Sequence, residues 1–557
     1  MTIRPDILAN PDWWRGAVIY QIYPRSFQDS NGDGVGDLPG ITARLEHIAG
    51  LGVDAIWISP IQKSPMKDFG YDVSDYDDVD PVFGTLGDFD TLITKAHSLG
   101  LKVIIDQVLS HTSDKHPWFQ ESRSDRSNPK ADWYVWADPL PDGSPPNNWR
   151  SVFGGSSWQW DSRRKQYYLH NFLAEQPDLN YHHPAVQDAA LASVRFWLER
   201  GLDGFRFDTT NYFHHDPLLR NNPALQRRWT PENLPANPYE MQQHLYDKNR
   251  PENVAWFEKV RQLLDLYGAT SVGEVGDAEA LDLMIAYTAG GKRLHMTYSF
   301  AFLNQDNSAT QVRRHTEAFD RAAQSSGSWP CWTLGNHDAV RVLTRWGGAG
   351  APADFTRLVM AMLFSLRGSV CWYQGDELAL PEAELAFEDL VDPPGIALWP
   401  EYKGRDGCRT PLPWQRHAPH AGFSPSGTAR TWLPIPPGHV ERSLDQAENN
   451  PNAPLHFMRA FLRWRQKQPE LLRGEAVHHG QSREVLVFER RLQGHHTGLL
   501  CAFNLSDKPI SVLLPTLPTR CTKVNIPGLP DHQLGACADH RLELPGYGVY
   551  IGSFGPA

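Results

Sequence analysis

The strand-like stretch that ends at Asp208 carries a cation and a carboxylate two residues apart, Arg206 and Asp208. Residues two apart along a strand share a face, so both side chains should point the same way. A neighbouring opposite charge favours the ionised form of a carboxylate. Taken alone, such a pair is most simply a structural ion pair. Two further acids, Glu274 and Asp338, occupy equivalent places later in the chain, and their presence indicates a functional site.

These acids suit the cleavage of a glycosidic bond, which needs two carboxyl groups flanking the bond. One group must stay ionised, and Arg206 can keep Asp208 in that form. The other must carry a proton at neutral pH. The apolar neighbours of Glu274, Val272 and Val275, are compatible with a pKa raised by desolvation. The two carboxyl groups would then act as a base and an acid.

The elements that must position these acids repeat as strand, loop and helix. Strand patterns alternate with helix patterns, which predicts βα units and a parallel sheet. Their number, eight, favours an α/β fold of the closed (β/α)8 TIM-barrel type, in which chemistry takes place at the C-terminal ends of the strands. The predicted strands are 18–23, 55–59, 102–108, 204–208, 270–274, 296–300, 332–334 and 369–373.

Two parts of the chain break this alternation. A proline- and tryptophan-rich segment, 111–180, predicts an inserted subdomain after the third strand. Short alternating runs near the end predict a C-terminal antiparallel β domain, 470–557. The barrel would therefore comprise 1–110 and 181–469, with irregular loops rich in proline and glycine over 376–451.

Composition excludes several classes of partner. The chain has 557 residues, too many for one core, and its net charge of -12 argues against nucleic-acid binding, which needs a basic face. The six cysteines show no Cys-x-x-Cys spacing and are interpreted as reduced thiols. No apolar stretch has the length of a signal peptide or a membrane span, so we expect a cytoplasmic protein without a membrane partner. A monomer and a dimer both fit the sequence.

Seven motifs follow one another along the barrel. Four hold the acids: Asp106-Gln-Val-Leu-Ser-His111, Gly204-Phe-Arg-Phe-Asp208, Gly273-Glu-Val275 and Asn336-His-Asp338. The others are Phe69-Gly-Tyr-Asp-Val-Ser-Asp-Tyr76, Gln176-Pro-Asp-Leu-Asn180 and Gly404-Arg-Asp-Gly-Cys-Arg-Thr-Pro-Leu-Pro-Trp414. By their number and order, the chain resembles the α-amylase superfamily, glycoside hydrolase family 13. Within it, the chain is similar to the oligo-1,6-glucosidase-like branch, which includes bacterial α-glucosidases.

The resemblance implies a role for each matching residue. Asp208 would be the nucleophile, Glu274 the general acid/base and Asp338 the stabiliser of the transition state. The residues expected to bind the non-reducing-end glucose are Asp72, His111, Arg206, His337 and Arg405, the last preferred to Arg409. Tyr71, Phe153 and Phe172 would wall the pocket, although ordinary core packing accounts equally well for Phe153 and Phe172.

A separate, oxygen-rich loop predicts a structural metal site. The predicted ligands are Asp29, Asn31, Asp33, the carbonyl of Val35, and Asp37. Their alternation imitates the first part of an EF-hand loop, and so many carboxylates would repel one another without a cation. The resembling branch holds Ca²⁺ here. Mg²⁺ is an alternative, because the glutamate at the twelfth position of an EF-hand is missing. A zinc pair of His111 and His337 lacks a third ligand at suitable spacing, and no organic cofactor is expected.

We therefore predict an exo-acting, retaining α-glucosidase acting on short oligosaccharides or glucosides. The resemblance associates threonine after the nucleophile with α-1,4 linkages and valine with α-1,6, so Thr209 favours a maltose-like substrate. Sucrose cleavage and transglucosylation also fit. A glucosyltransferase that forms or isomerises sucrose or trehalose would share the same acids. An inactive scaffold of the same family is an alternative from another class, although a scaffold has no physical need for three converging acids.

Overall fold

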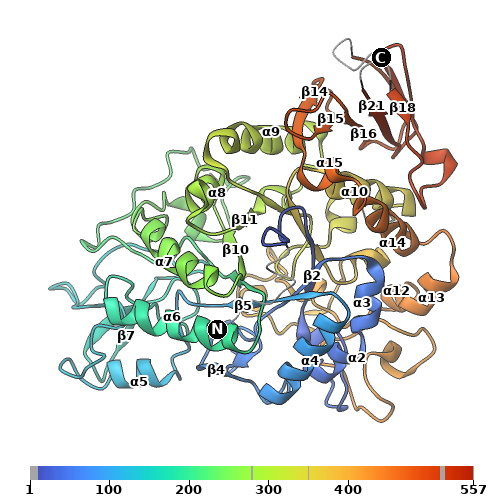
Figure 1. The fold of residues 1–557 in the computed structure, drawn as a ribbon. Coiled ribbons are helices and arrows are strands. Elements are labelled where there is room, and N and C mark those ends of the chain that lie inside the picture. The colour runs from blue at the N-terminus through green and yellow to red at the C-terminus, as the bar shows by residue number, and fades with distance from the viewer. Residues whose placement is uncertain (1–9, 278–279, 349, 515–520, 556–557) are drawn as a thin grey trace.

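The structure, a computed structural model, describes residues 10–277, 280–348, 350–514 and 521–555. A central barrel carries an inserted subdomain on one side, long loops on another, and a β-sheet domain at one end (Figure 1). The predicted fold class, including both additions, is confirmed. The exact boundaries at 110/111, 180/181 and 469/470 stay a prediction.

Eight parallel strands form the barrel, in the order β11-β10-β9-β5-β2-β1-β13-β12. A parallel bridge between Thr297 and Pro330 joins the two ends of this order. Every predicted strand is present. The strands are β1 (Val18–Ile22), β2 (Ala55–Ile58), β5 (Lys102–Gln107), β9 (Gly204–Phe207), β10 (Thr270–Val275), β11 (Met296–Ser299), β12 (Cys331–Thr333) and β13 (Ser369–Tyr373).

Helices surround the sheet and begin at residues suited to that position. Helix α4 starts with a reciprocal capping box between Thr85 and Asp88, and α6 starts at Pro184. The stretch from Leu38 to Leu51 forms two short helices, because the backbone of Arg44 between them is not helical (φ -107°, ψ 6°). The main helices are α2 (Leu38–Ala43), α3 (Leu45–Leu51), α4 (Leu86–Ser98), α6 (Pro184–Glu199), α7 (Asn253–Asp265), α8 (Ala280–Thr288), α9 (Ala309–Ser326), α10 (Ala353–Ser365) and α14 (Pro454–Arg465).

The segment between β5 and α6 forms a small unit of its own. Its ends meet at an antiparallel bridge between His111 and Asp178, and Trp149 and Trp158 stack inside it. A second small sheet, β3 with β4, lies between β2 and α4 in the chain. The elements are β3 (Gln62–Lys63), β4 (Asp75–Val79), α5 (Pro117–Ser122), β6 (Trp136–Ala137), β7 (Trp158–Asp161) and β8 (Gln166–Leu169).

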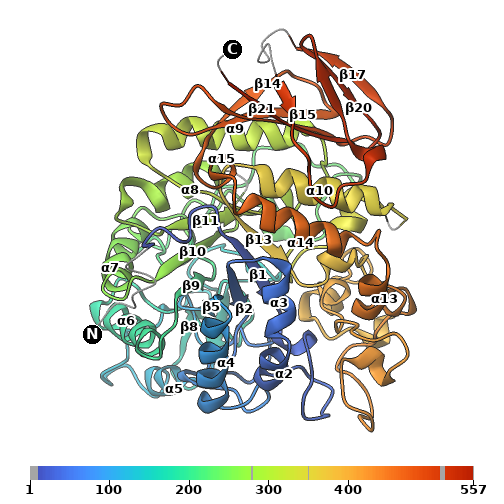
Figure 2. The same cartoon turned by 45° about the vertical axis from the view of Figure 1, so that its right-hand side comes forward.

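The C-terminal strands form two antiparallel sheets, β14-β15-β16-β21-β18 and β17-β20-β19. Figure 2 shows them lying above α9 and α10, and the guanidinium of Arg490 donates to the carbonyl of Ser365 at the end of α10 (2.7 Å). The elements are α15 (Pro469–Arg473), β14 (Glu475–His479), β15 (Val485–Arg491), β16 (Gly498–Asn504), β17 (Ile510–Leu513), β18 (Cys521–Lys523), β19 (Ala536–Ala538), β20 (Arg541–Leu544) and β21 (Val549–Phe554).

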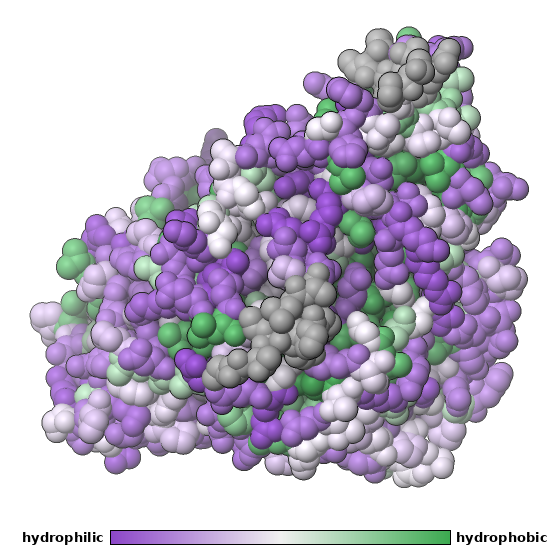
Figure 3. All heavy atoms as spheres, viewed as in Figure 1, coloured by the Kyte–Doolittle hydropathy of each residue, from purple (hydrophilic) through white to green (hydrophobic). Residues whose placement is uncertain are grey.

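Between β13 and α14 the chain runs mostly as loops, with the short helices α11 (Pro393–Ala397), α12 (Pro437–Val440) and α13 (Leu444–Asn449). The face seen in Figure 3 is largely hydrophilic, with small groups of apolar residues scattered over it. Within the described part of the chain, no helix is both long and apolar enough to cross a membrane.

Candidate active site

The guanidinium of Arg206 lies at the centre of the acids. It donates through Nη1 to Asp106 (2.7 Å) and Asp208 (2.6 Å), and its Nη2 pairs with Glu274 Oε1 (2.6 Å). Tyr298 accepts a further hydrogen bond from Nη2 at 2.8 Å. Strand register explains the convergence, because Asp106 is paired with Arg206 across β5 and β9, and Glu274 with Tyr298 across β10 and β11. One buried cation thus faces three carboxyl groups from three strands.

The two predicted catalytic carboxyl groups differ in acidity. Burial raises the pKa of Glu274 to about 7, and the negative charges of Asp208 and Asp338 act in the same direction. Burial also raises the pKa of Asp208, to about 6, while Arg206 opposes the rise. Near neutral pH, Asp208 is therefore mainly ionised while much of Glu274 carries a proton. A nucleophile and a general acid require this order of acidities.

Glu274 owes its place to a tight strand end. A Cβ on the preceding Gly273 would lie 2.6 Å from Leu294 Cδ1 and 3.0 Å from Thr210 Cγ2. Glycine therefore lets the ends of β9 and β10 approach each other. Thr210 donates from its backbone N–H (3.1 Å) and from its hydroxyl to the carbonyl of Glu274.

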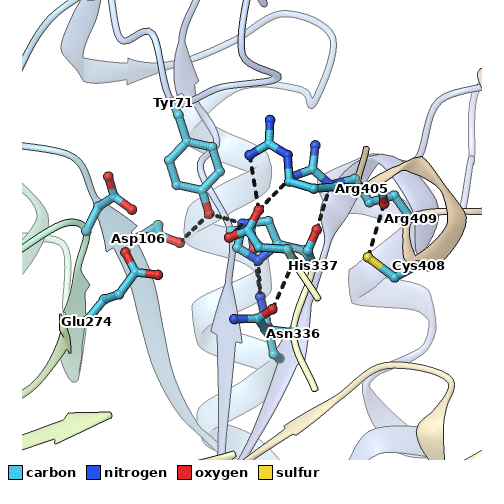
Figure 4. Close-up of polar contacts among 12 residues, drawn as sticks. Tyr71, Asp106, Glu274, Asn336, His337, Arg405, Cys408 and Arg409 are labelled. Carbon is cyan, nitrogen blue, oxygen red and sulfur yellow. Dashed lines mark hydrogen bonds and ion pairs between the residues drawn. The ribbon is translucent and has the colours of Figure 1, made fainter. Parts of the chain in front are cut away.

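Asp338 is held by cations from the loop after β13. Although burial alone would raise its pKa, the charges of Arg405 and Arg409 keep the pKa of Asp338 well below its ordinary value. Arg409 Nη2 donates to Asp338 Oδ1 at 2.7 Å, and Arg405 Nη1 donates to the same atom at 3.2 Å. In Figure 4 both arginines reach towards His337 from the side opposite Glu274. Asp338 is thus ionised.

Tyr71 connects His337 to Asp106, as Figure 4 shows. Burial lowers the pKa of His337 to about 3, so its ring is neutral. Gln21 Nε2 donates to Nδ1 at 2.8 Å, which leaves the ring proton on Nε2. Nε2 lies 2.5 Å from the Tyr71 hydroxyl, which in turn donates to Asp106 at 3.1 Å. This series of hydrogen bonds fixes the position of the Tyr71 side chain.

These groups open into a cavity of about 950 Å³. Of the residues predicted to bind or react with sugar, those that line it are Asp208, Glu274, Asp338, Tyr71, His111, Phe153, Phe172, Thr209 and Arg405. Arg206 and His337 are 1% and 0% exposed and hold the acids from behind. Arg409 likewise contacts Asp338 but does not line the cavity, whereas Arg405 contacts Asp338 and also lines the cavity.

Asp72 also lies outside the cavity lining. It is fully buried, and its oxygens accept hydrogen bonds from Ser64 Oγ and from the backbone N–H groups of residues 67 and 68. It therefore holds its own loop together and does not line the cavity. Asp68 lines the cavity instead, paired with Arg405 Nη2 at 2.9 Å. Asp68 directly precedes the motif Phe69–Tyr76 that contains Asp72, and the turn of the loop decides which of the two faces inward.

Sequence reasoning also missed several supporting residues. Asp392, fully buried, accepts from Arg405 Nη2 at 2.6 Å and orients that side chain. Trp57 and Tyr298 enclose Arg206 within the barrel. The segment after β9 supplies the far wall of the cavity through Tyr212, Leu225, Tyr239, Leu245 and Lys248. Of these, Tyr298 alone carried a recognisable pattern, as a polar group near the end of a predicted strand.

In the predicted metal loop, the carboxylates accept hydrogen bonds from the loop backbone. Asp29 accepts from the N–H groups of residues 31, 32 and 34, and Asp37 accepts from residues 30 and 40. These bonds relieve part of the repulsion on which the prediction relied. Among the described residues, no three or more His, Cys, Asp or Glu side chains come together as ligands for a metal ion.

The chain is similar to known proteins over most of its length. Residues 21–474 match the family model of the α-amylase catalytic domain. A probable α-glucosidase of Rhizobium meliloti is 54% identical, with 97% of each chain covered. Maltase 1 of Drosophila virilis is 38% identical, over 96% of this chain and 84% of its own.

Solved structures give the same result. The crystal structure of an α-glucosyl transfer enzyme superposes with a TM-score of 0.92 at 54% identity, over 97% of this chain and 99% of its own. A trehalulose synthase is more distant, with a TM-score of 0.85 at 30% identity, over 97% of this chain and 100% of its own. Barrel, acid constellation and full-length similarity together show that this chain belongs to the α-amylase family, glycoside hydrolase family 13.

Proposed function

We propose that the protein is an exo-acting, retaining α-glucosidase that releases α-glucose from the non-reducing end of short α-glucosides. The observation that carries the proposal is the single guanidinium of Arg206, which contacts both Asp208 and Glu274 while their pKa values differ. Retaining glycosidases need this pairing of an ionised nucleophile with a protonated acid. Full-length similarity to a probable α-glucosidase supports the same activity.

In the first step, an oxygen of Asp208 attacks the anomeric carbon while Glu274 gives its proton to the glycosidic oxygen. The bond between the anomeric carbon and the glycosidic oxygen breaks, and the aglycone leaves with the proton. A glucosyl ester of Asp208 remains. Positive charge develops on the sugar ring in the transition state. The ionised Asp338, on the same cavity wall, stabilises this charge through the sugar hydroxyls.

In the second step, Glu274, now ionised, takes a proton from water as the water oxygen attacks the anomeric carbon. The ester bond to Asp208 breaks, and glucose leaves with its original α configuration after two inversions. Arg206 stays paired with Asp106 throughout, so it does not need to move as the charges on the other two acids change.

We assign glucose recognition to Asp68, Tyr71, His111 and Arg405. All four line the cavity, and the Asp68–Arg405 pair provides acceptors and donors for sugar hydroxyls next to Asp338. Phe153 and Phe172, whose rings meet edge to face 5.6 Å apart, form an apolar wall for the sugar ring. Burial lowers the pKa of His111 to about 4, so it acts as a neutral hydrogen-bonding group.

The direct test is glucose release from p-nitrophenyl α-glucoside, followed by a panel of maltose, isomaltose, sucrose, trehalose and starch. Asp208→Asn is the control, because it removes the nucleophile while nearly keeping the shape. Turnover by the wild type that the control lacks supports the proposal. An inactive wild-type protein would instead favour the scaffold hypothesis.

For linkage, we propose that α-1,4 is preferred over α-1,6 through Thr209. This residue lines the cavity and donates its backbone N–H to Glu274 Oε2 at 3.1 Å, which brings it close to the leaving group. Its hydroxyl lies 2.8 Å from the hydroxyl of Ser110.

Transglucosylation is a second activity that one observation favours. Apolar side chains at the cavity wall remain partly exposed: Leu225 36%, Leu245 51%, Phe300 40% and Tyr402 38%. Such a wall holds an organic acceptor better than water. With concentrated maltose, oligosaccharides longer than maltose should therefore appear among the products. Hydrolysis alone cannot form them, and chromatography of the products would detect them.

We propose that residues 29–37 bind a divalent cation, Ca²⁺ or Mg²⁺, far from the chemistry. Asp29 and Asp37 are 1% and 2% exposed, and the predicted donors, including Asn31, Asp33 and the Val35 carbonyl, are all oxygens, which suits a hard cation. A carboxylate oxygen that accepts an N–H keeps a lone pair for a metal. The ion would stabilise the loop and the start of α2, which Asp37 caps.

We also infer a cytoplasmic location from the cysteines. The sulfurs of Cys331 and Cys371 lie only 3.5 Å apart without a disulfide. Thiols this close stay reduced most readily in a reducing compartment. Cell fractionation would test the location.

A further inference from the structure

Thr209 has a backbone conformation that its side chain disfavours. Its φ is +44°, in the left-handed region, which is unusual for a β-branched residue. Such strain persists only when the surroundings impose it. The conformation directs the N–H of Thr209 at Glu274 Oε2, 3.1 Å away. A strained residue therefore holds one oxygen of the acid/base.

The partner that holds Thr209 is Ser110. This serine is fully buried, and Leu179 donates its N–H to the Ser110 carbonyl at 3.0 Å. Its Oγ lies 2.8 Å from Thr209 Oγ1 and 3.0 Å from His111 Nδ1. Ser110 therefore joins the end of β5 to the residue that follows the nucleophile.

The direction of these hydrogen bonds follows from His111. Its Nε2 lies 3.0 Å from the carbonyl oxygen of Tyr71 and 3.2 Å from Gln176 Nε2. A carbonyl can only accept, and this contact is the shorter one, so we place the ring proton on Nε2. Neutral His111 then accepts through Nδ1, and the donor is the Ser110 hydroxyl. Ser110 Oγ is left to accept, so the hydroxyl proton of Thr209 points at Ser110.

We propose that Ser110 is a positioning residue for the reaction: it accepts the hydroxyl of Thr209, holds that residue in the left-handed conformation, and thereby aims its N–H at the acid/base Glu274. This assignment rests on the proposed glycosidase function. It also means that Thr209 Oγ1 can accept, but not donate, a hydrogen bond toward a bound sugar.

The other groups around Glu274 come from every neighbouring strand. They are Arg206 and Asp208 from β9 and its end, Tyr298 from β11, and Asp338 after β12, with Asp106 of β5 reached through Arg206. Against this background an N–H aimed at Oε2 favours the ionised carboxylate, because it donates to the charged form. Loss of that N–H should raise the pKa of Glu274.

The experiment compares wild type with Ser110→Ala on maltose and on p-nitrophenyl α-glucoside across the pH range. We expect kcat/KM on maltose to fall roughly 3- to 10-fold, as for one lost hydrogen bond. The fall should be smaller on the aryl glucoside, whose leaving group needs less protonation. The alkaline limb of the profile should move to higher pH, because a raised pKa keeps the acid protonated further.

Two variants separate this role from others. Ser122→Ala removes an equally buried hydroxyl that accepts from Trp136 and donates to the Ala131 carbonyl, both in the inserted subdomain, and it should leave the pH profile unchanged. Thr209→Gly reaches positive φ without strain and without a hydroxyl. Adding Ser110→Ala to Thr209→Gly should therefore have no further effect.

An alkaline limb that stays in place in Ser110→Ala would overturn the assignment while leaving the glycosidase function intact. A further shift in the Thr209→Gly background would also overturn it, because Ser110 would then act through His111. A wild type without glucosidase activity would refute the proposed function and this assignment together. The assignment of Ser110 would be supported if Ser110→Ala lowered activity more on maltose than on the aryl glucoside, and if this difference disappeared in the Thr209→Gly background.

Discussion

Replacement of Glu274 by glutamine tests the acid/base assignment most directly. The side chains have the same shape, but an amide cannot give a proton to the glycosidic oxygen. The carboxyl group contacts Arg206 Nη2 (2.6 Å), Tyr298 Oη (3.2 Å) and the Thr209 N–H (3.1 Å). All three are donors, so a glutamine can satisfy some of them with its single oxygen while its NH₂ group faces the rest.

The expected size of the effect follows from the role. General acid–base catalysis contributes roughly 10²- to 10⁴-fold, and we expect kcat on maltose to fall within this range. The pH dependence should change in one limb only. Wild-type activity requires ionised Asp208 and protonated Glu274, so the acid limb should lie near the pKa of about 6 and the alkaline limb near about 7. Because Glu274 is already neutral at low pH, a neutral glutamine should keep the acid limb and abolish the alkaline one.

The assay is kcat/KM over roughly pH 4–9 on maltose and p-nitrophenyl α-glucoside. The aryl glucoside should lose less activity in the glucosylation step, because p-nitrophenolate leaves without a proton. Azide should accelerate turnover of the glucosyl enzyme in the variant, since it attacks without deprotonation. A thermal melt provides the control that the fold is intact.

Two results would refute the reasoning. If the folded variant keeps an alkaline limb, another group is the acid. If its loss of activity is equal on both substrates and azide has no effect, the defect lies in binding or in the nucleophile. β-Glucose as the first-formed product of the wild type would also contradict the retaining mechanism.

Three further predictions concern specificity and stability. Thr209→Val should lower the maltose-to-isomaltose ratio of kcat/KM by about tenfold, the effect expected from the loss of one hydrogen bond. An unchanged ratio would mean that other residues determine the linkage preference. Asp68→Asn should lower kcat/KM on maltose roughly 10- to 100-fold through loss of a charged acceptor, while Asp72→Asn should mainly lower Tm; the reverse outcome would restore Asp72 as the sugar ligand. Asp33→Ala should lower Tm more than the rate per folded molecule, and a chelator should destabilise the wild type but not the variant; if metal analysis finds no ion and chelation has no effect on wild type, the site is not real.

Local sequence was sufficient for much of the fold. Apolar strands closed by polar or glycine-rich turns identified every barrel strand, because strand and helix periodicities depend on neighbouring residues. Strand alternation also placed Arg206 and Asp208 on one face, and they make contact at 2.6 Å. The break at Arg44 was not predictable from periodicity, because the apolar stripe continues through it.

Other features depend on contacts between distant parts of the chain. Asp72 lies in the motif Phe69–Tyr76 and Asp68 directly precedes it, yet the turn of the loop directs Asp68 into the cavity towards Arg405, 337 residues away. Likewise, Arg405 and Arg409 both donate to Asp338, but of the two it is Arg405 that lines the cavity.

The sequence by itself determined the barrel, the order of its strands along the chain, and the acids at their ends, since each follows from the pattern of adjacent residues. Only the tertiary structure decided how far the pKa of each acid is shifted. The pKa of a carboxyl group depends on burial and on charges that fold around it, and for Glu274 these come from Arg206, Asp208 and Asp338. It also decided the role of Ser110, whose hydroxyl meets Thr209 only because β5 and β9 lie side by side in the barrel.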